Sequence, residues 1–341
     1  MKILYGVQGT GNGHISRASS MFEAFRNYPE LKVTWLLSGR DRQRGCGAIE
    51  HFEWRSGLTF VTENGKINLI KTARQNKLGR FWRDVSELDV KGYDLLITDF
   101  EPVLAHAARK RGMPVVGIGH QYAFRYSIPL KNSNVFVKGL MDAFAPATRS
   151  VGLHWHHFGH PILPPIVDVP ALTDRQLSQS NKVIVYLPFE NLEGIQALFR
   201  QWPEYQFYIY HPEVWNRNFD HHNLHLRCIS REGFKHDLVT SSRVITNSGF
   251  ELISECLQLG KAILTKPLQG QMEQHSNAAA LEQLGYATVL DELDPQQVRQ
   301  WLKADIKPIQ LAYPDVAAAL AQWVAGGCTQ TEQELAAQLW Q

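Results

Sequence analysis

The sequence predicts an α/β protein with two Rossmann-like domains that face each other across a cleft. Its 341 residues are too many for one typical domain of about 150 residues. Short apolar or β-branched runs alternate with helical patterns in both halves of the chain, as in parallel sheets covered by helices. Three prolines within residues 161–165 stiffen the middle of the chain, and the polar residues 168–181 follow. We therefore expect domains over residues 1–160 and 161–325, with a final helix of about residues 326–341 packing back on the first domain.

The overall composition argues against several classes of protein. A net charge of +2 is too small to indicate a nucleic-acid partner. The four cysteines include no C-x-x-C pair, which argues against a zinc knuckle or a disulfide framework and fits a reducing compartment. No apolar run reaches the roughly 18 residues of a membrane-spanning helix. We expect a cytoplasmic protein.

The first strand, residues 3–7, runs into a glycine-rich turn that ends in a histidine. Gly9, Gly11 and Gly13 give the spacing G-x-G-x-G, which departs from the dinucleotide fingerprint G-x-G-x-x-G. Glycines allow a ligand to approach the backbone closely, and His14 titrates near neutral pH, so the turn suits proton transfer. The alternative is that His14 only caps the following helix.

A carboxylate is expected beside this histidine. In a doubly wound sheet of order 3-2-1-4-5, the strand that ends at Asp99 lies next to the strand that leads to His14. A carboxylate bonded to one imidazole nitrogen orients the ring and raises the basicity of the other nitrogen. The alternative role for Asp99 is the N-cap of the helix over residues 103–110. The strands expected in this half are residues 3–7, 33–37, 58–61, 95–98 and 115–118.

Three features of the first half carry weaker signals. Arg40 follows the second strand and would suit a 2′-phosphate, which keeps an NADP-binding oxidoreductase as an alternative. Residues 122–144 mix aromatic and basic side chains and could meet an anionic membrane surface, but they lack a long amphipathic register, so partial burial in the core is favoured. The histidines within residues 154–160 lack a completing cysteine or carboxylate, so we expect no metal.

The second half is organised around residues 244–278. A short strand leads into the turn formers Asn247, Ser248 and Gly249, and a helix then ends at Gly260. Ligands of open α/β sheets bind beyond the carboxyl ends of the strands, where backbone N–H groups at a helix N-terminus can meet an anion. The strands expected in this half are residues 183–187, 206–210, 225–229, 243–246, 262–265 and 287–290.

Acidic and amide side chains complete this second site. Glu251 and Glu255 lie four residues apart on one face of the helix, where carboxylates suit the hydroxyls of a ribose. The polar residues 269–277 supply amides and an acid that suit a sugar. A nucleotide joined to a sugar fits this combination.

These motifs together make the chain resemble the GT-B glycosyltransferases, most closely the MurG-like and UDP-glycosyltransferase branch. The resemblance spans the whole chain and rests on residues 9–14, 98–102, 248–260 and 267–278. It implies a nucleotide-sugar donor, most often UDP-linked, and a hydroxyl acceptor that could be lipid-linked or a glycan, the former with peripheral contact at the inner face of the membrane. No cofactor is implied.

The resemblance also implies roles for individual residues. His14 would deprotonate the acceptor with help from Asp99. Glu255 would bind the donor ribose, and Glu273 and Gln274 would lie against the donor sugar. Phe234 would pack by the nucleobase, with a role in the core as an equal alternative. The remaining expected donor-site residues are Gly11, Gly13, Asn247, Ser248 and Gly249.

Two departures from the family pattern bear on the reaction. Many retaining relatives carry two glutamates spaced E-x7-E, but Asn247 stands where the first would be, so we expect inversion without a metal. Pro188 and Glu190 occupy a loop that is glycine-rich in MurG-type enzymes, which puts its diphosphate contacts in doubt. The alternative enzyme of this fold is a UDP-N-acetylhexosamine epimerase.

Overall fold

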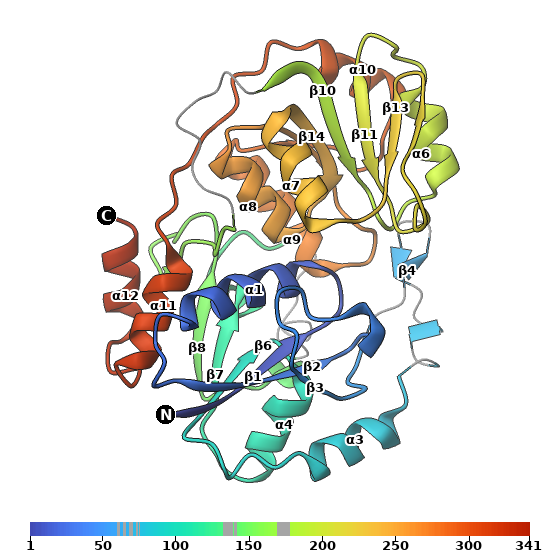
Figure 1. Ribbon diagram of the computed structural model, residues 1–341. Coiled ribbons are helices and arrows are strands. Elements are labelled where there is room, and N and C mark those ends of the chain that lie inside the picture. Colours follow the sequence, from blue (N-terminus) through green and yellow to red (C-terminus); the bar gives the residue numbers. More distant parts are fainter. Residues whose placement is uncertain are drawn as a thin grey trace.

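The computed structural model describes residues 1–59, 62, 63, 66, 67, 71, 72, 74, 76–131, 139, 142–168 and 178–341. It contains two seven-stranded sheets, one in each half of the chain, and a small two-stranded sheet of Thr62–Glu63 (β4) and Lys66–Ile67 (β5). The two halves are stacked, with helices α8 (Phe250–Gln258) and α9 (Met272–Leu284) of the second half facing α1 (Gly13–Phe25) of the first (Figure 1). The predicted fold class is confirmed.

The sheet of the first half is parallel, with the order β3-β2-β1-β6-β7-β8-β9. The expected order 3-2-1-4-5 is therefore confirmed, and two strands extend it. β9 joins this sheet although it lies just beyond residue 160. The strands are β1 (Lys2–Gln8), β2 (Lys32–Ser38), β3 (Glu53–Trp54), β6 (Leu95–Asp99), β7 (Val116–Gly119), β8 (Arg149–Leu153) and β9 (Ile162–Leu163).

The third strand was expected over residues 58–61, and this was wrong for the part that the structure describes. The sheet is extended instead by β3, while the backbone N–H and C=O of Thr59 are both bound by the side-chain amide of Asn76, at 2.9 and 2.8 Å. A side chain thus satisfies the backbone groups that a sheet ladder would use. Residues 60 and 61 lie outside the described residues.

The sheet of the second half has the order β12-β13-β11-β10-β14-β15-β16, and only the β12–β13 pair within it is antiparallel. All six expected strands are found, with ends that differ by up to four residues. The strands are β10 (Gln179–Tyr186), β11 (Gln206–Tyr210), β12 (Phe219–His221), β13 (Leu224–Arg227), β14 (Ser241–Asn247), β15 (Ala262–Lys266) and β16 (Thr288–Val289).

Helices cover both sheets in the described part of the chain. The α-helices are α1 (Gly13–Phe25), α3 (Leu78–Glu87), α4 (Pro102–Lys110), α6 (Leu192–Phe199), α7 (Arg231–Thr240), α8 (Phe250–Gln258), α9 (Met272–Leu284), α10 (Pro295–Lys303), α11 (Val316–Ala325) and α12 (Glu332–Leu339). Short 3-10 helices span Arg42–Arg44 (η1) and His120–Arg125 (η2). None of the described helices is long and apolar enough to cross a membrane.

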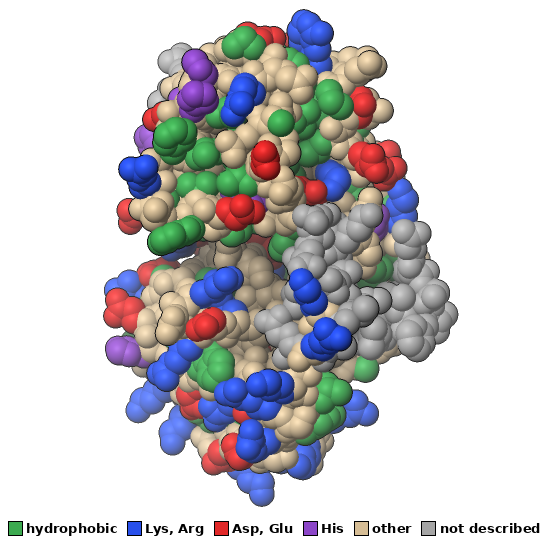
Figure 2. All heavy atoms as spheres, turned by 90° about the vertical axis from the view of Figure 1, so that its right-hand side faces the viewer, with side chains coloured by type: hydrophobic (Ala, Val, Ile, Leu, Met, Phe, Trp, Pro, Cys, Tyr) green, Lys and Arg blue, Asp and Glu red, His purple; other side chains and the backbone are tan. Residues whose placement is uncertain are grey.

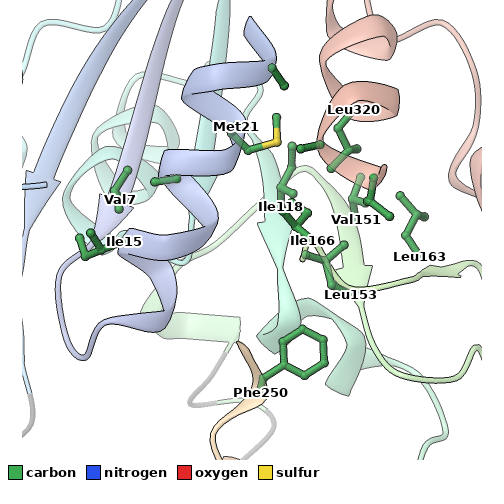
Figure 3. Packing of buried hydrophobic residues seen from close by; sticks show 14 of the residues in the cluster. Val7, Ile15, Met21, Ile118, Val151, Leu153, Leu163, Ile166, Phe250 and Leu320 are labelled. Carbon is green, nitrogen blue, oxygen red and sulfur yellow. The ribbon is translucent and has the colours of Figure 1, made fainter. Parts of the chain in front are cut away.

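The C-terminal segment returns to the first half, as expected, but as two helices. α11 packs on α1, where Met21 and Leu320 face each other (Figure 3). Gly327, with φ of 74°, ends that helix region, and a capping box between Thr331 and Glu334 starts α12. The indole N–H of Trp340 then donates to the carbonyl of Ile162 in β9, at 2.6 Å. The C-terminal helices therefore pack on the N-terminal half of the chain.

A buried contact joins the two halves beside the cleft. The ring of His120 stacks on Phe250 at the start of α8, with ring centroids 3.9 Å apart. The indole N–H of Trp155 donates to the hydroxyl of Ser254 at 2.9 Å, and all four of these residues are fully or almost fully buried. Residue 250 therefore belongs to a core that also contains strands of the first half (Figure 3).

The aromatic and basic segment of residues 122–144 starts inside the protein. Tyr122 and Phe124 in η2 are only 1% and 3% exposed, so the favoured interpretation of burial holds for them. Residues 132–138, 140 and 141 lie outside the described residues, as do residues 169–177 of the expected crossing between the domains.

Candidate functional site

The predicted histidine and aspartate meet at the carboxyl ends of β1 and β6. These strands are neighbours with Val7 opposite Asp99, and His14 stands in the first turn of α1. His14 Nδ1 lies 2.8 Å from Asp99 Oδ1. The surface is indented where the two halves meet (Figure 2), and this pair lies at the junction.

Neither residue acts as a helix cap. The N-cap of α1 is Asn12, which makes no side-chain capping bond. The N-cap of α4 is Glu101, whose carboxylate accepts from the N–H groups of Val103 and Leu104 at 2.7 Å each. The alternative roles considered for His14 and Asp99 are therefore filled by other residues.

Arg17 completes this cluster, and the sequence analysis missed it. Its side chain is 1% exposed and grips Asp99 with two nitrogens: Nε lies 3.0 Å from Oδ2, and Nη2 contacts Oδ1. Burial alone raises the pKa of Asp99, but the charge of Arg17 and then His14 outweigh it and lower that pKa below its usual value. Asp99 therefore stays ionised. The available signal was the spacing of three residues from His14, which puts both side chains on one helix face.

The hydrogen bonds assign the protons on the imidazole. Nδ1 of His14 lies 2.8 Å from both Asp99 Oδ1 and Arg17 Nη2. The ionised Asp99 carboxylate can only accept, so its bond with the ring requires a proton on Nδ1, whereas a bond from Arg17 Nη2 would require Nδ1 to accept. We assign the proton to the bond with Oδ1. Nε2 then keeps its lone pair and can accept a proton.

Glu251 reaches this cluster from the opposite half. Its carboxylate forms an ion pair with Arg17 Nη1, so one guanidinium bridges Asp99 of the first half and an acid in α8 of the second. A Cβ atom at position 13 would overlap the Glu251 carboxylate, so a side chain there would push this carboxylate aside. Gly11 has φ of 80° and open space around it, so its requirement is conformational.

We expect Gly13→Ala to destabilise the protein by about 1–3 kcal/mol, because the new methyl group pushes Glu251 away from Arg17. Urea unfolding measures this loss. Gly79→Ala is the matched control, since a Cβ there meets nothing within 4 Å. In a protein that already carries Glu251→Ala, the same Gly13 substitution should lower the free energy of unfolding much less. Equal losses in both backgrounds would contradict this account of Gly13.

Gln121, also missed, connects the imidazole with the predicted sugar-binding acid. Its side-chain nitrogen lies 3.5 Å from His14 Nε2 and donates to Glu273 Oε2 at 3.2 Å. Glu273, in the first turn of α9, is therefore brought close to His14. Gln274 is not, because its side chain is 6% exposed and its Oε1 accepts from the N–H of Leu268 at 2.8 Å. In this structure Gln274 holds the preceding loop.

The turn after β14 is held by its own side chains. Asn247 donates to the carbonyl of Lys266 at 3.1 Å, and the hydroxyls of Ser248 and Thr265 are 2.9 Å apart. The carbonyl of Ser248 accepts from Asn277 at 3.0 Å. A Cβ at Gly249 would meet nothing within 4 Å. The two polar side chains therefore shape the turn, whereas Gly249 leaves open space for a ligand.

Glu255 is a buried carboxyl group in α8, the helix that follows this turn. Burial raises its pKa to about 7, and the negative charges of Asp168 and Glu251 add to this rise. The positive charges of Lys235 and Arg231 oppose it. Both cations pair with Asp168 instead of Glu255. In the part of the chain that the structure describes, no donor hydrogen-bonds to the Glu255 carboxylate, which leaves it available to hydroxyl groups.

Phe234 occupies an aromatic cluster. Its ring lies 5.5 Å from that of Tyr186 and 4.9 Å from that of Tyr210, both edge to face, and it packs against the main core. These contacts fit the alternative of a core role.

In the loop after β10, which contains Pro188, the negative charge of Glu190 is neutralised by an ion pair. Glu190 Oε1 lies 2.6 Å from Lys266 Nζ at the end of β15, and both side chains are mostly buried. The repulsion between this glutamate and a phosphate, expected from the sequence, is therefore offset by an adjacent cation.

The described residues contain no cluster of three or more His, Cys, Asp or Glu side chains that could hold a metal ion. The histidines at the end of β8 are used in packing instead. His154 is fully buried beside His120 and Phe158, and burial lowers its pKa well below the usual value.

Two Rossmann-like halves, each with a mostly parallel seven-stranded sheet, are the architecture of glycosyltransferases with the GT-B fold. The model of glycosyl transferase family 1 matches residues 1–305, and the chain belongs to this family. The protein is a glycosyltransferase. No curated protein sequence matches the chain significantly.

Solved structures share the fold over nearly their whole length. The glycotransferase of kitacinnamycin has a TM-score of 0.59 at 15% identity and covers 99% of this chain and 97% of its own. MurG of Acinetobacter baumannii has a TM-score of 0.53 at 14% identity, with 99% of both chains covered. SsfS6 of Streptomyces sp. SF2575, complexed with thymidine diphosphate, has a TM-score of 0.55 at 11% identity, with 98% of both covered. At these identities the likeness concerns the fold.

Proposed function

We propose that the protein transfers a sugar from a nucleoside-diphosphate sugar, UDP-linked in our assignment, to a hydroxyl acceptor with inversion and without a metal. The single observation that carries this proposal is the His14–Asp99 hydrogen bond of 2.8 Å at the junction of the two halves. This bond would leave Nε2 of His14 as a basic nitrogen where the two halves meet. Residues 1–160 would serve the acceptor, and residues 161–325 would bind the donor.

The reaction would be a single displacement. His14 Nε2 takes the proton of the acceptor hydroxyl while the oxygen attacks the anomeric carbon from the face opposite the diphosphate. The bond between that carbon and the diphosphate oxygen breaks, and the diphosphate leaves with the electron pair. Backbone N–H groups at the start of α8 would stabilise its charge, as they do for anions at helix N-termini generally. Asp99 would hold the ring and stabilise the imidazolium.

Donor binding would rest on α8 and α9. The unpartnered carboxylate of Glu255 would accept hydrogen bonds from the ribose, and Glu273 would contact the sugar. The open space at Gly249 supports a diphosphate at that turn. Thymidine diphosphate bound to the fold neighbour SsfS6 supports a nucleoside diphosphate as the donor moiety.

The test is a screen of UDP-sugars, and of thymidine-linked sugars, with and without a panel of alcohol acceptors and in EDTA. We expect UDP release that depends on the acceptor, is insensitive to EDTA, and gives a product of inverted anomeric configuration by NMR. Conversion of a UDP-sugar into an epimer without acceptor would refute the transferase assignment in favour of an epimerase. A retained configuration would refute the single displacement.

A further inference from the structure

Arg40 lies beside the glycine-rich turn and is held there by its backbone and its stem. Gly39, with φ of 80°, turns the chain after β2, and the carbonyl of Arg40 accepts from the indole N–H of Trp54 at 2.9 Å. A Cβ atom at Gly9 would come within 2.5 Å of Arg40 Cγ. The glycine therefore makes room for the arginine stem, and the arginine lines the turn.

The guanidinium of Arg40 lacks a protein partner. Its Nε is buried without a hydrogen bond, and over the described ranges of the chain no carboxylate pairs with the group. The carboxylate of the adjacent Asp41 accepts from the N–H of Gln43 at 2.8 Å and caps the short helix η1. Burial lowers the pKa of Arg40, and the like charge of Arg44 lowers it further. A cation that is partly desolvated and has no charged partner is unfavourable, so this position favours an anionic ligand.

Two neighbours place Arg40 where the two halves meet. Tyr186, at the end of β10 in the opposite half, interacts electrostatically with Arg40 and also accepts from Asn12 at 3.2 Å, two residues before His14. The thiol of Cys46 lies within electrostatic reach of both Arg40 and Asp99. The guanidinium therefore belongs to the half that carries His14 and Asp99, and it faces β10 of the other half.

We infer that Arg40 binds an anionic group of the acceptor, a phosphate or a carboxylate. A guanidinium presents a planar pair of donors that matches both oxyanions, and Arg44 adds positive charge nearby. Arg40 belongs to the half that carries His14, whereas the open turn at Gly249 and the free carboxylate of Glu255 lie on the other half. The inference rests on the proposed function, because it assigns the acceptor to the first half.

Binding measurements test this assignment without turnover. Isothermal titration of the full chain would use UDP first, and then glucose, glucose 6-phosphate and glucuronate, each with and without saturating UDP. The variants are Arg40→Gln, Arg40→Lys and, as the matched control, Arg42→Gln, which removes an exposed charge two residues away. Circular dichroism and thermal unfolding would verify that each variant is folded.

We expect the two charged sugars to bind the wild type at least about tenfold more tightly than glucose, as charge-assisted hydrogen bonds predict. Arg40→Gln should remove that preference, and Arg40→Lys should keep part of it. Arg42→Gln should show the same preference as the wild type, and all three variants should keep the wild-type affinity for UDP. Equal binding of charged and neutral sugars, or a loss of UDP affinity in Arg40→Gln, would overturn the inference. A failure of UDP to bind would count against the proposed function alone, since the comparison of sugars on the UDP-free protein still tests Arg40.

Discussion

His14→Ala should lower the rate of sugar transfer by about 10²- to 10⁴-fold while the affinity for the UDP-sugar stays nearly the same. The reason is that general-base catalysis by a positioned imidazole contributes about that much, and His14 stands on the half opposite the proposed donor site. Single-turnover rates with saturating donor measure the first quantity, and calorimetric titration of UDP measures the second. Asp99→Asn should lower the rate as well, because an amide can hold the ring in the wrong tautomer.

The control for this prediction is His51→Ala, which removes an exposed histidine of the same half. Its transfer rate should equal that of the wild type. Full transfer activity in His14→Ala would refute the assignment of His14 as the base. If His14→Ala lost donor affinity but kept the transfer rate, His14 would be assigned to donor binding instead of catalysis.

Glu255→Gln should weaken donor binding by about tenfold or more and yet stabilise the free protein at alkaline pH. The amide loses a charged acceptor for the ribose hydroxyls. The pKa of about 7 in the folded protein lies above the value of 4.5 for an exposed glutamate. The folded state therefore binds the proton more tightly than the unfolded state. Protonated Glu255 therefore contributes to the free energy of unfolding in full below about pH 4.5, and this contribution is lost as the pH rises through about 7.

Urea unfolding at pH 5 and at pH 8 measures this second effect. The glutamine variant should be more stable than the wild type at pH 8 by up to about 3 kcal/mol, with a smaller difference at pH 5. Glu282→Gln, at an exposed position of α9, is the control and should show neither effect. An unchanged donor affinity in Glu255→Gln would remove Glu255 from the binding site, whatever its effect on stability.

The part of the site that could be predicted is the part that local patterns and strand order define. His14 follows a glycine-rich turn, and Asp99 ends a strongly apolar strand. The rule that parallel strands present their carboxyl ends at one edge then brings the two together. Glu255 was predicted from its register on a helix after a turn; it is buried, and among the described residues no donor hydrogen-bonds to its carboxylate, while its role toward a ribose stays a prediction.

The partners from distant parts of the chain could not be predicted in the same way. An arginine within a helix is usually solvated, yet Arg17 is buried because two carboxylates from other elements, 82 and 234 residues away, converge on it. The neutralisation of Glu190 by Lys266 depends on a contact between residues 76 positions apart. Gln274 looked like its neighbour Glu273 in the sequence, but its side chain turns inward to the loop at Leu268.

By itself the sequence determined the fold class, the family resemblance and the chemical character of the two facing turns. These follow from short-range patterns: the alternation of strands and helices, the glycines that a tight turn demands, and the polar groups at strand ends. Only the tertiary structure decided which charges are paired and which are left free. Pairing depends on distances of a few ångströms between groups far apart in the chain. Packing of the two halves sets those distances, and among the described residues it left the Glu255 carboxylate and the Arg40 guanidinium without hydrogen-bond partners, on opposite halves of the molecule.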